Sequence, residues 1–229
     1  MGLRDGIPIF LGYFAVSFAF GIFAVASGLS VIEALLVSML DLTSAGQFAA
    51  IPIICAGGSF AELALSQFVI NLRYSLMSVS LSQHLGEHVS FLDRFWIAFG
   101  NTDEIFAVSV SKGAPLGRKF FLGLIMMPYI GWSAGTLLGA VAGNVLPDIV
   151  TSALGIAIYG MFIAIIMPDA KKRRPTALCI IAAVALGCVL RFVPLFSSIS
   201  DGFVIIICAV TVSLVFALLF PLEEEAENG

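Results

Sequence analysis

The sequence predicts an all-α polytopic membrane protein, and three observations lead to this fold class. Hydrophobic residues make up 60% of the 229 residues, whereas charged residues make up only 11%. A water-soluble domain of this length cannot bury so much apolar surface. In addition, the apolar residues gather in stretches close to the roughly 20 residues that a helix needs to cross a bilayer.

About eight transmembrane segments can be drawn, and we expect them to form a single transmembrane domain over residues 1–229. The second and third are long and polar in the middle, and the fourth is short and polar, so we expect some helices in the first half to be broken. The segments comprise residues 7–27, 31–57, 60–82, 95–111, 120–142, 149–167, 176–192 and 203–220. Whether residues 31–57 span once or dip back as a re-entrant pair stays open.

Lys and Arg residues predict the orientation, because they are retained on the cytoplasmic side of membrane proteins. With eight spans and a cytoplasmic N-terminus, Arg94 and Arg191 fall on the outer side. We therefore expect a multi-pass protein of the cell (inner) membrane with both termini in the cytoplasm. The acidic residues 223–227 then form a cytoplasmic tail. The basic residues on the cytoplasmic side are Arg4, Lys112, Arg118, Lys119, Lys171, Lys172, Arg173 and Arg174.

The segment over residues 31–57 carries polar side chains at a depth where a lipid-facing helix would not tolerate them. Asp41, Ser44 and Gln47 lie in its middle, and each costs several kcal/mol to remove from water unless it finds a partner. Gly46 permits a bend or a close backbone approach, and Pro52 lacks a hydrogen-bond donor. This pattern predicts a broken helix at the centre of a substrate pathway.

The segment over residues 60–82 has one polar face and a basic residue. Gln67 and Asn71, followed by three serines, recur at helical spacing. Arg73 lies near the middle of the span, so it requires an acidic partner from another segment unless it reaches an interface. Asp41, Asp103 and Glu104 are the candidate partners.

The segment over residues 95–111 contains the run Gly100-Asn101-Thr102-Asp103-Glu104. Two adjacent carboxylates in an apolar span persist by pairing, by protonation or by facing water. Such carboxylates carry protons in many membrane pumps and transporters. The alternative is a segment that does not span and leaves these groups in water.

Small residues mark the second half of the chain. Gly131, Gly135, Gly139 and Gly143 recur at strict i+4 spacing, which predicts a strip for close helix packing, either static or as a sliding contact. Residues 21–36 also resemble residues 139–154 weakly, which suggests a possible parallel 4+4 repeat.

His84-Leu85-Gly86-Glu87-His88 matches the H-x-x-E-H pattern of inverted zinc peptidases. A zinc site would need a third ligand, for which Asp93 or Asp103 is available. Gly86 weakens a helix, and no soluble domain surrounds the motif, so we favour an ordinary extracytoplasmic loop. An intramembrane zinc peptidase is kept as an unlikely alternative.

Three motifs in order resemble the AzlC family of branched-chain amino-acid exporters. They are Ser44-Ala45-Gly46-Gln47-Phe48, Asn71-Leu72-Arg73-Tyr74 and Thr102-Asp103-Glu104. The resemblance covers about residues 3–220, and Tyr74 stands where the family commonly has His. It implies export of branched-chain amino acids together with a small AzlD-like membrane subunit of about four spans. No G-x-x-x-x-G-K-[ST] motif is present, so no ATP hydrolysis can be placed on this chain.

We therefore expect a secondary exporter of small amino acids, driven by the proton motive force, rather than an enzyme. We expect no cofactor, no metal and no nucleic-acid partner. A channel or an uptake carrier for another small polar solute is the alternative. Asp103 and Glu104 are the candidates for proton coupling. The candidate substrate-binding residues are Asp41, Ser44, Gly46, Gln47, Asn71, Arg73, Tyr74 and Asn101.

Overall fold

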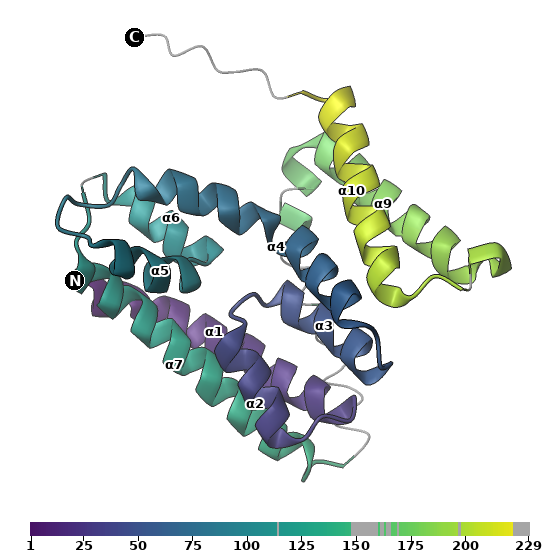
Figure 1. Ribbon diagram of the computed structural model, residues 1–229, viewed down its shortest axis with the longest axis horizontal. Helices are drawn as coiled ribbons and strands as arrows, with labels where there is room; N and C mark the ends of the chain where they lie inside the picture. The colour runs from purple at the N-terminus through teal and green to yellow at the C-terminus, as the bar shows by residue number, and fades with distance from the viewer. Residues whose placement is uncertain are drawn as a thin grey trace.

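The computed structural model describes residues 1–113, 115–147, 160, 163, 166–168, 170–196 and 198–221. These residues form α-helices and no β-strand (Figure 1). Most of the predicted span over residues 149–167 and the whole acidic tail lie outside the described residues. The helices are α1 (Gly2–Ala26), α2 (Val31–Leu40), α3 (Ala45–Cys55), α4 (Phe60–Ser82), α5 (Phe91–Phe99), α6 (Asp103–Ser111), α7 (Arg118–Gly143), α9 (Arg174–Phe192) and α10 (Asp201–Leu219), with a short 3-10 helix, Pro194–Phe196.

The all-helical membrane architecture is confirmed, whereas the count of eight spans is not. Within the described residues, four helices are long and apolar enough to cross a membrane, namely α1, α7, α9 and α10. Helix α4, with 23 residues, is longer than α9 and α10, but it is more polar. The predicted spans over residues 31–57 and 95–111 are each divided into two short helices.

Residues 31–57 fold as a re-entrant pair rather than as one span. Helices α2 and α3 contain 10 and 11 residues, so each rises only about 15 Å along its axis. Figure 1 shows α2 running to the middle of the molecule and α3 returning toward the end where α1 stops. Consistent with this path, Gly28 and Leu29 line the same surface hollow as Ile54 and Cys55.

Residues 91–111 form a second re-entrant pair, which enters from the opposite end of the molecule. Helices α5 and α6 have nine residues each. The start of α5 lies beside the start of α7, where Arg118 Nε is 3.3 Å from Asp93 Oδ1. The end of α6 lies beside the start of α1, where Lys112 Nζ is 2.8 Å from Asp5 Oδ2. Both ends of this pair therefore lie at the end of the molecule where α1 and α7 begin.

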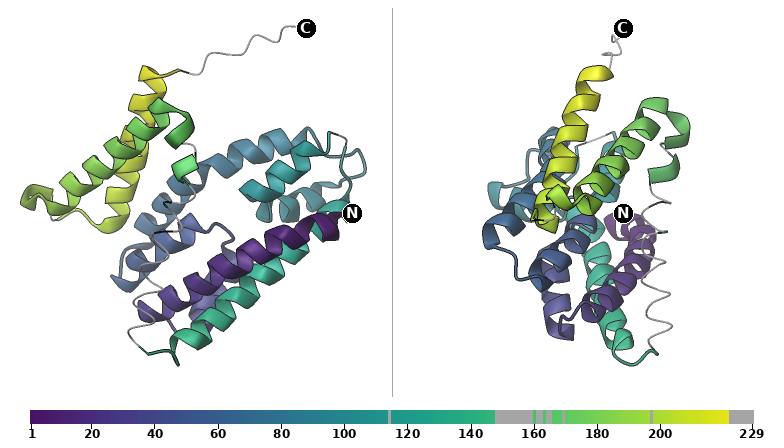
Figure 2. Two further views of the ribbon diagram at one scale, coloured as in Figure 1. Left: turned by 180° about the vertical axis from the view of Figure 1, so that it is seen from behind. Right: turned by 90° about the vertical axis from the view of Figure 1, so that its right-hand side faces the viewer.

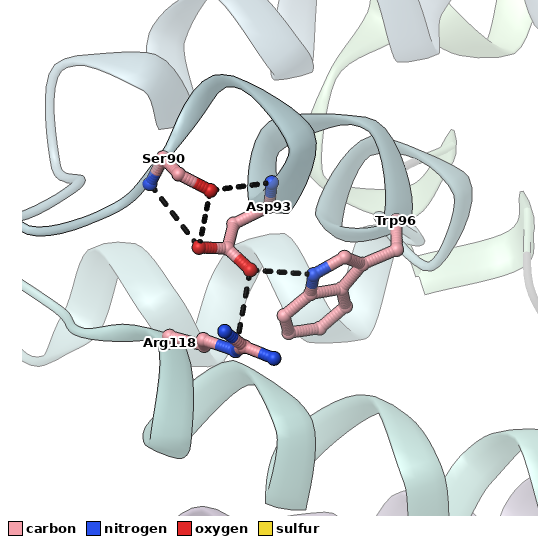
Figure 3. Close-up of polar contacts among 4 residues, drawn as sticks. All are labelled: Ser90, Asp93, Trp96 and Arg118. Atoms are coloured by element: carbon pink, nitrogen blue, oxygen red, sulfur yellow. Dashed lines mark hydrogen bonds and ion pairs between the residues drawn. The ribbon is translucent and has the colours of Figure 1, made fainter.

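Asp93 organises the entry into this second pair (Figure 3). Its carboxylate accepts hydrogen bonds from the backbone and side chain of Ser90 and from the indole of Trp96, at 3.0 Å, and it pairs with Arg118. The Ser90 side chain, followed by Trp96, lowers the pKa of Asp93 below its ordinary value. Asp93 is thus an anchor between α5 and α7.

The second pair overturns the predicted placement of Arg94 and of the loop that contains His84. The Gly86 amide donates to the Leu116 carbonyl at 2.9 Å, and the Leu116 amide donates to the His84 carbonyl at 2.9 Å. Two segments that share backbone hydrogen bonds cannot lie on opposite sides of a bilayer. Arg94 therefore lies on the same side as Arg118, and the predicted location of the loop on the opposite side is wrong.

The two re-entrant pairs make residues 2–55 and 60–111 structurally alike. Each unit has one long helix followed by two short ones, and each first short helix begins with a full capping box, at Ser30 and Ser90. Helix α4 runs opposite to α1 (Figures 1 and 2), so the units have inverted orientations. Transporters commonly use such inverted repeats. The predicted parallel repeat is not confirmed, and its second copy extends beyond residue 147 into undescribed residues.

The glycine strip of α7 packs against α1, which runs alongside it in parallel (Figure 2). A Cβ added at Gly131, Gly135 or Gly139 would collide with the α1 backbone at Phe10, Phe14 or Phe18, respectively. Backbone carbonyls of α1 thus recur every four residues opposite the α7 glycines. This fit allows the two helix backbones to touch and explains why the strip is glycine.

Helices α9 and α10 form a hairpin that touches the rest of the described chain mainly through the start of α4. Glu62 is buried, with 7% of its surface exposed. Its carboxylate accepts hydrogen bonds from the Ser200 hydroxyl and, at 3.1 Å, from the Gly202 amide. Glu62 therefore caps the N-terminus of α10, where a negative charge is favourable.

Candidate functional site

A cavity of about 780 Å³ lies where the breaks of the two re-entrant pairs face each other. Helices α1, α3, α4, α6 and α7 all contribute to its wall, which is mostly apolar with a small charged group. The described residues that line it are Pro8, Ile9, Gly12, Tyr13, Val16, Leu42, Ser44, Ala45, Ile70, Arg73, Tyr74, Asp103, Glu104, Trp132 and Ile166.

The first break confirms the broken helix predicted at residues 41–48. Helix α2 ends at Leu40, and Ser44 adopts a left-handed backbone conformation with φ of +41° before α3 begins. A Cβ at Gly46 would overlap Thr43 Oγ1 and lie 2.5 Å from Gln67 Oε1, so this close approach requires glycine. Ser44 makes no side-chain cap, and the first turn of α3 contains no acid. The positive end of α3 is therefore not compensated by a side chain of its own first turn.

The second break places two carboxylates at the N-terminus of α6. Residues Gly100, Asn101 and Thr102 leave the helical conformation, and α6 begins with Asp103 and Glu104. Carboxylates are favoured at this position because the helix dipole and the free amide groups are positive there. Two helix N-termini thus lie at the cavity. The positive end of α6 is compensated by its own carboxylates, whereas the positive end of α3 is not.

Arg73 finds the acidic partner that its position in the span requires. Its Nη1 atom lies 2.8 Å from Asp103 Oδ2, which selects Asp103 among the three candidate acids. The pair is about half-exposed, with 52% and 45% of the two side chains accessible. The guanidinium also donates to the Tyr74 hydroxyl at 3.2 Å and lies 4.9 Å from the centre of its ring.

Glu104 has a different partner, which the sequence did not reveal. The hydroxyl of Tyr13 on α1 donates to Glu104 Oε2 at 2.5 Å. The Tyr13 ring packs edge-on against Trp132 of α7, with the ring centres 5.2 Å apart. Neither aromatic residue disturbs the hydropathy of its segment, so no sequence signal marks them. Only the pairing of α1 with α7 brings them to the cavity.

Gln47 and Asn101 lie in buried polar contacts and are absent from the cavity lining. Gln47 is completely buried and donates to the Ser38 hydroxyl at 3.2 Å, which in turn lies 2.5 Å from the hydroxyl of Thr136. These contacts join α2, α3 and α7. Asn101 is also buried and donates to Ser78 on α4 at 3.2 Å.

The remaining predicted residues divide into two groups. Ser44, Arg73, Tyr74, Asp103 and Glu104 line the cavity together. Asp41, Gly46 and Asn71 belong to a second polar group beside the first break. There, Thr43 donates to Asp41 at 2.6 Å, Gln67 donates to the Gly46 carbonyl at 2.9 Å, and Asn71 donates to Gln67 at 3.2 Å.

The H-x-x-E-H motif does not gather metal ligands in the described part of the chain. No group of three or more His, Cys, Asp or Glu side chains suited to a metal occurs among the described residues. His84 Nδ1 instead lies 3.1 Å from the Ser80 carbonyl. Asp93, one of the two predicted third ligands, is engaged by Ser90, Trp96 and Arg118.

Several proteins of similar sequence are named as membrane proteins. The sequence model of the AzlC protein family matches residues 8–146. An uncharacterized membrane protein of Archaeoglobus fulgidus is 36% identical over 191 residues, which cover 81% of this chain and 82% of that protein. The inner membrane protein YgaZ of Escherichia coli is 30% identical over 189 residues, or 80% and 76% of the two chains.

A third relative carries a functional name. The branched-chain amino acid transport protein AzlC of Bacillus subtilis is 24% identical over 180 residues, which cover 73% of this chain and 66% of that protein. No solved structure is detectably similar to this chain.

Proposed function

This chain belongs to the AzlC family, and from that premise we propose that it is a secondary exporter of small amino acids, above all leucine, isoleucine and valine. The observation that carries the proposal is the cavity between the two helix breaks. Its volume lies in the range of small-molecule sites, and its wall is apolar with a few charged groups. A branched-chain amino acid has the same combination of one apolar end and two charges.

The two ends of the substrate match different parts of the wall. The α3 N-terminus at Ser44 and Ala45 has no acid in its first turn, so its amide groups suit the substrate carboxylate. Arg73 offers a second positive group on the same cavity. The substrate ammonium suits Glu104, and the apolar side chain suits the wall near Ile70.

Proton coupling is assigned to Asp103 and Glu104. Asp103 is neutralised by Arg73, whereas Glu104 faces a phenol, which carries no charge to balance the carboxylate. Uptake of a proton by Glu104 would remove the negative charge that holds an ammonium group in the cavity. Loading and release of the substrate are thereby linked to proton movement across the membrane.

We further propose that the protein lies in the cell membrane with its N-terminal end in the cytoplasm and works with a small AzlD-like subunit of about four spans. Each re-entrant pair enters and leaves the membrane on its own single side, so neither pair changes the side on which the next helix begins. The positive-inside rule still holds, because Arg94 now joins Lys112, Arg118 and Lys119 at the cytoplasmic end. If residues 149–167 span once, α9 and α10 return the C-terminus to the cytoplasm.

Cysteine labelling tests this topology. In a variant that lacks the four natural cysteines, single cysteines at Glu87 and Lys119 are expected to react with an impermeant maleimide from the same side. A cysteine at Val145, beyond the end of α7, is expected to react from the other side. Labelling of Glu87 together with Val145 would instead support eight simple spans and contradict the second re-entrant pair.

Transport itself is tested in proteoliposomes that contain the chain with and without its neighbouring small subunit. A proton gradient is expected to drive uphill movement of leucine, isoleucine and valine, and collapse of the gradient by a protonophore is expected to stop it. In cells fed dipeptides, deletion is expected to raise intracellular valine. Depletion of valine would indicate an uptake carrier, and gradient-independent flux without saturation would indicate a channel.

A further inference from the structure

A second polar group lies at the first helix break but outside the cavity lining. Leu42, Ser44 and Ala45 line the cavity, whereas their neighbours Asp41 and Thr43 do not. Thr43 instead contacts Asp41, with 2.6 Å between Thr43 Oγ1 and Asp41 Oδ1. The unwound segment therefore presents Leu42 and Ser44 to the cavity, whereas Thr43 lies near Gln67 of α4.

The atoms on the Thr43 side of the break include several side-chain oxygens. Thr43 Oγ1 and Gln67 Oε1 crowd around the position of a Gly46 Cβ. Asn71 Nδ2 lies 3.1 Å from the same point and donates to Gln67 Oε1, so the Asn71 oxygen is left for another partner. Asn71 Oδ1 is buried and accepts no hydrogen bond from the described residues. A buried carbonyl oxygen without a donor is costly, and a ligand with positive character would satisfy it.

The electrostatics on the Asp41 side of the break also favour a cation, whereas the positive end of α3 lies on the cavity side at Ser44 and Ala45. Asp41 is partly buried and forms no ion pair with any described residue, since Arg73 is taken by Asp103. Helix α2 ends at Leu40, so the negative end of its dipole points to the same place. A carboxylate, neutral side-chain oxygens and the carbonyl end of a broken helix form the kind of site at which membrane transporters hold Na⁺.

We propose that Asp41, Thr43, Gln67 and Asn71 form a Na⁺ site at the break between α2 and α3. One carboxylate among neutral oxygens suits a monovalent ion, whereas Ca²⁺ sites commonly use several carboxylates. The separation of these residues from the cavity lining favours a small ion over the ammonium group of an amino acid. Binding of Na⁺ does not depend on what the cavity transports, and only its use as a coupling ion rests on the proposed function.

The test is the thermal stability of the purified full-length chain at constant ionic strength, with NaCl replacing choline chloride. A ligand that binds only the folded protein stabilises it, so saturating Na⁺ is expected to raise the apparent unfolding midpoint by roughly 5 °C. Asp41→Asn and the nearly isosteric Thr43→Val are expected to lose this rise. Asp201→Asn, which removes a half-exposed carboxylate paired with Arg191, is the matched control and is expected to retain it.

Three results would overturn the proposal. The first is an equal midpoint in NaCl and choline chloride, and the second is an undiminished Na⁺ response in Asp41→Asn. The third is an Asp41-dependent rise caused by leucine in the absence of Na⁺, which would assign the oxygens to the substrate ammonium. The thermal readout does not involve transport. A failed export assay therefore leaves a positive Na⁺ response valid, and an absent Na⁺ response leaves a positive export assay valid.

Discussion

Asp103→Asn is expected to reduce leucine export by roughly tenfold or more, because it leaves Arg73 without its charged partner at the cavity. The pair is half-exposed, so its loss should cost about 1–2 kcal/mol, between the values for surface and buried pairs. The freed guanidinium would also attract the substrate carboxylate too strongly and hinder release. The measurement is the initial rate of leucine export, both down its own gradient and against it.

Glu104→Gln provides the matched comparison, because the amide can still accept a hydrogen bond from Tyr13 but cannot take up a proton. We expect it to lose uphill transport driven by a proton gradient. Exchange of labelled for unlabelled leucine should persist only at higher leucine concentrations, because the neutral amide no longer holds the substrate ammonium. Asp103→Asn should impair both reactions. Proton-driven export at the wild-type rate in both variants would remove these carboxylates from the mechanism.

Sequence patterns were sufficient to predict the first helix break and the need of Arg73 for an acidic partner. Asp41 and Ser44 interrupt an apolar run, and this anomaly indicated the helix break that the structure shows at residues 41–44. Arg73 in a span required an acid from elsewhere, and Asp103 is that acid. In both cases the reasoning rests on the high cost of isolated polar groups in an apolar environment, which leaves few arrangements possible.

The re-entrant folding and the apolar half of the site could not be predicted in this way. The length of residues 31–57 suits one long span as well as two short helices, and hydropathy does not record the direction of a chain. Changing two spans into re-entrant pairs also keeps the main basic loops on the same side, so the charge rule gave no warning. Tyr13 and Trp132 are ordinary residues in apolar helices, and their role depends on contacts between α1 and α7.

Gly139→Ala is expected to separate α1 from α7 and to destabilise the fold. The added methyl group would overlap the Phe18 carbonyl, and this is backbone that cannot move aside as a flexible side chain does. Overpacking of this kind costs about 1–3 kcal/mol, which corresponds to a fall of roughly 4–10 °C in the apparent unfolding midpoint. The matched control is Gly187→Ala on α9, where the nearest contact, Cys208 Sγ, is 3.9 Å away.

The same pair of variants separates the two roles that the glycine strip allows. In the control, alanine is the better helix former, so the midpoint should stay unchanged or rise slightly. If Gly139→Ala lowers the midpoint and export falls with the amount of folded protein, the strip is a static contact. If the midpoint stays at the wild-type value while export is lost, α1 and α7 slide along the strip during transport, and the static interpretation is wrong.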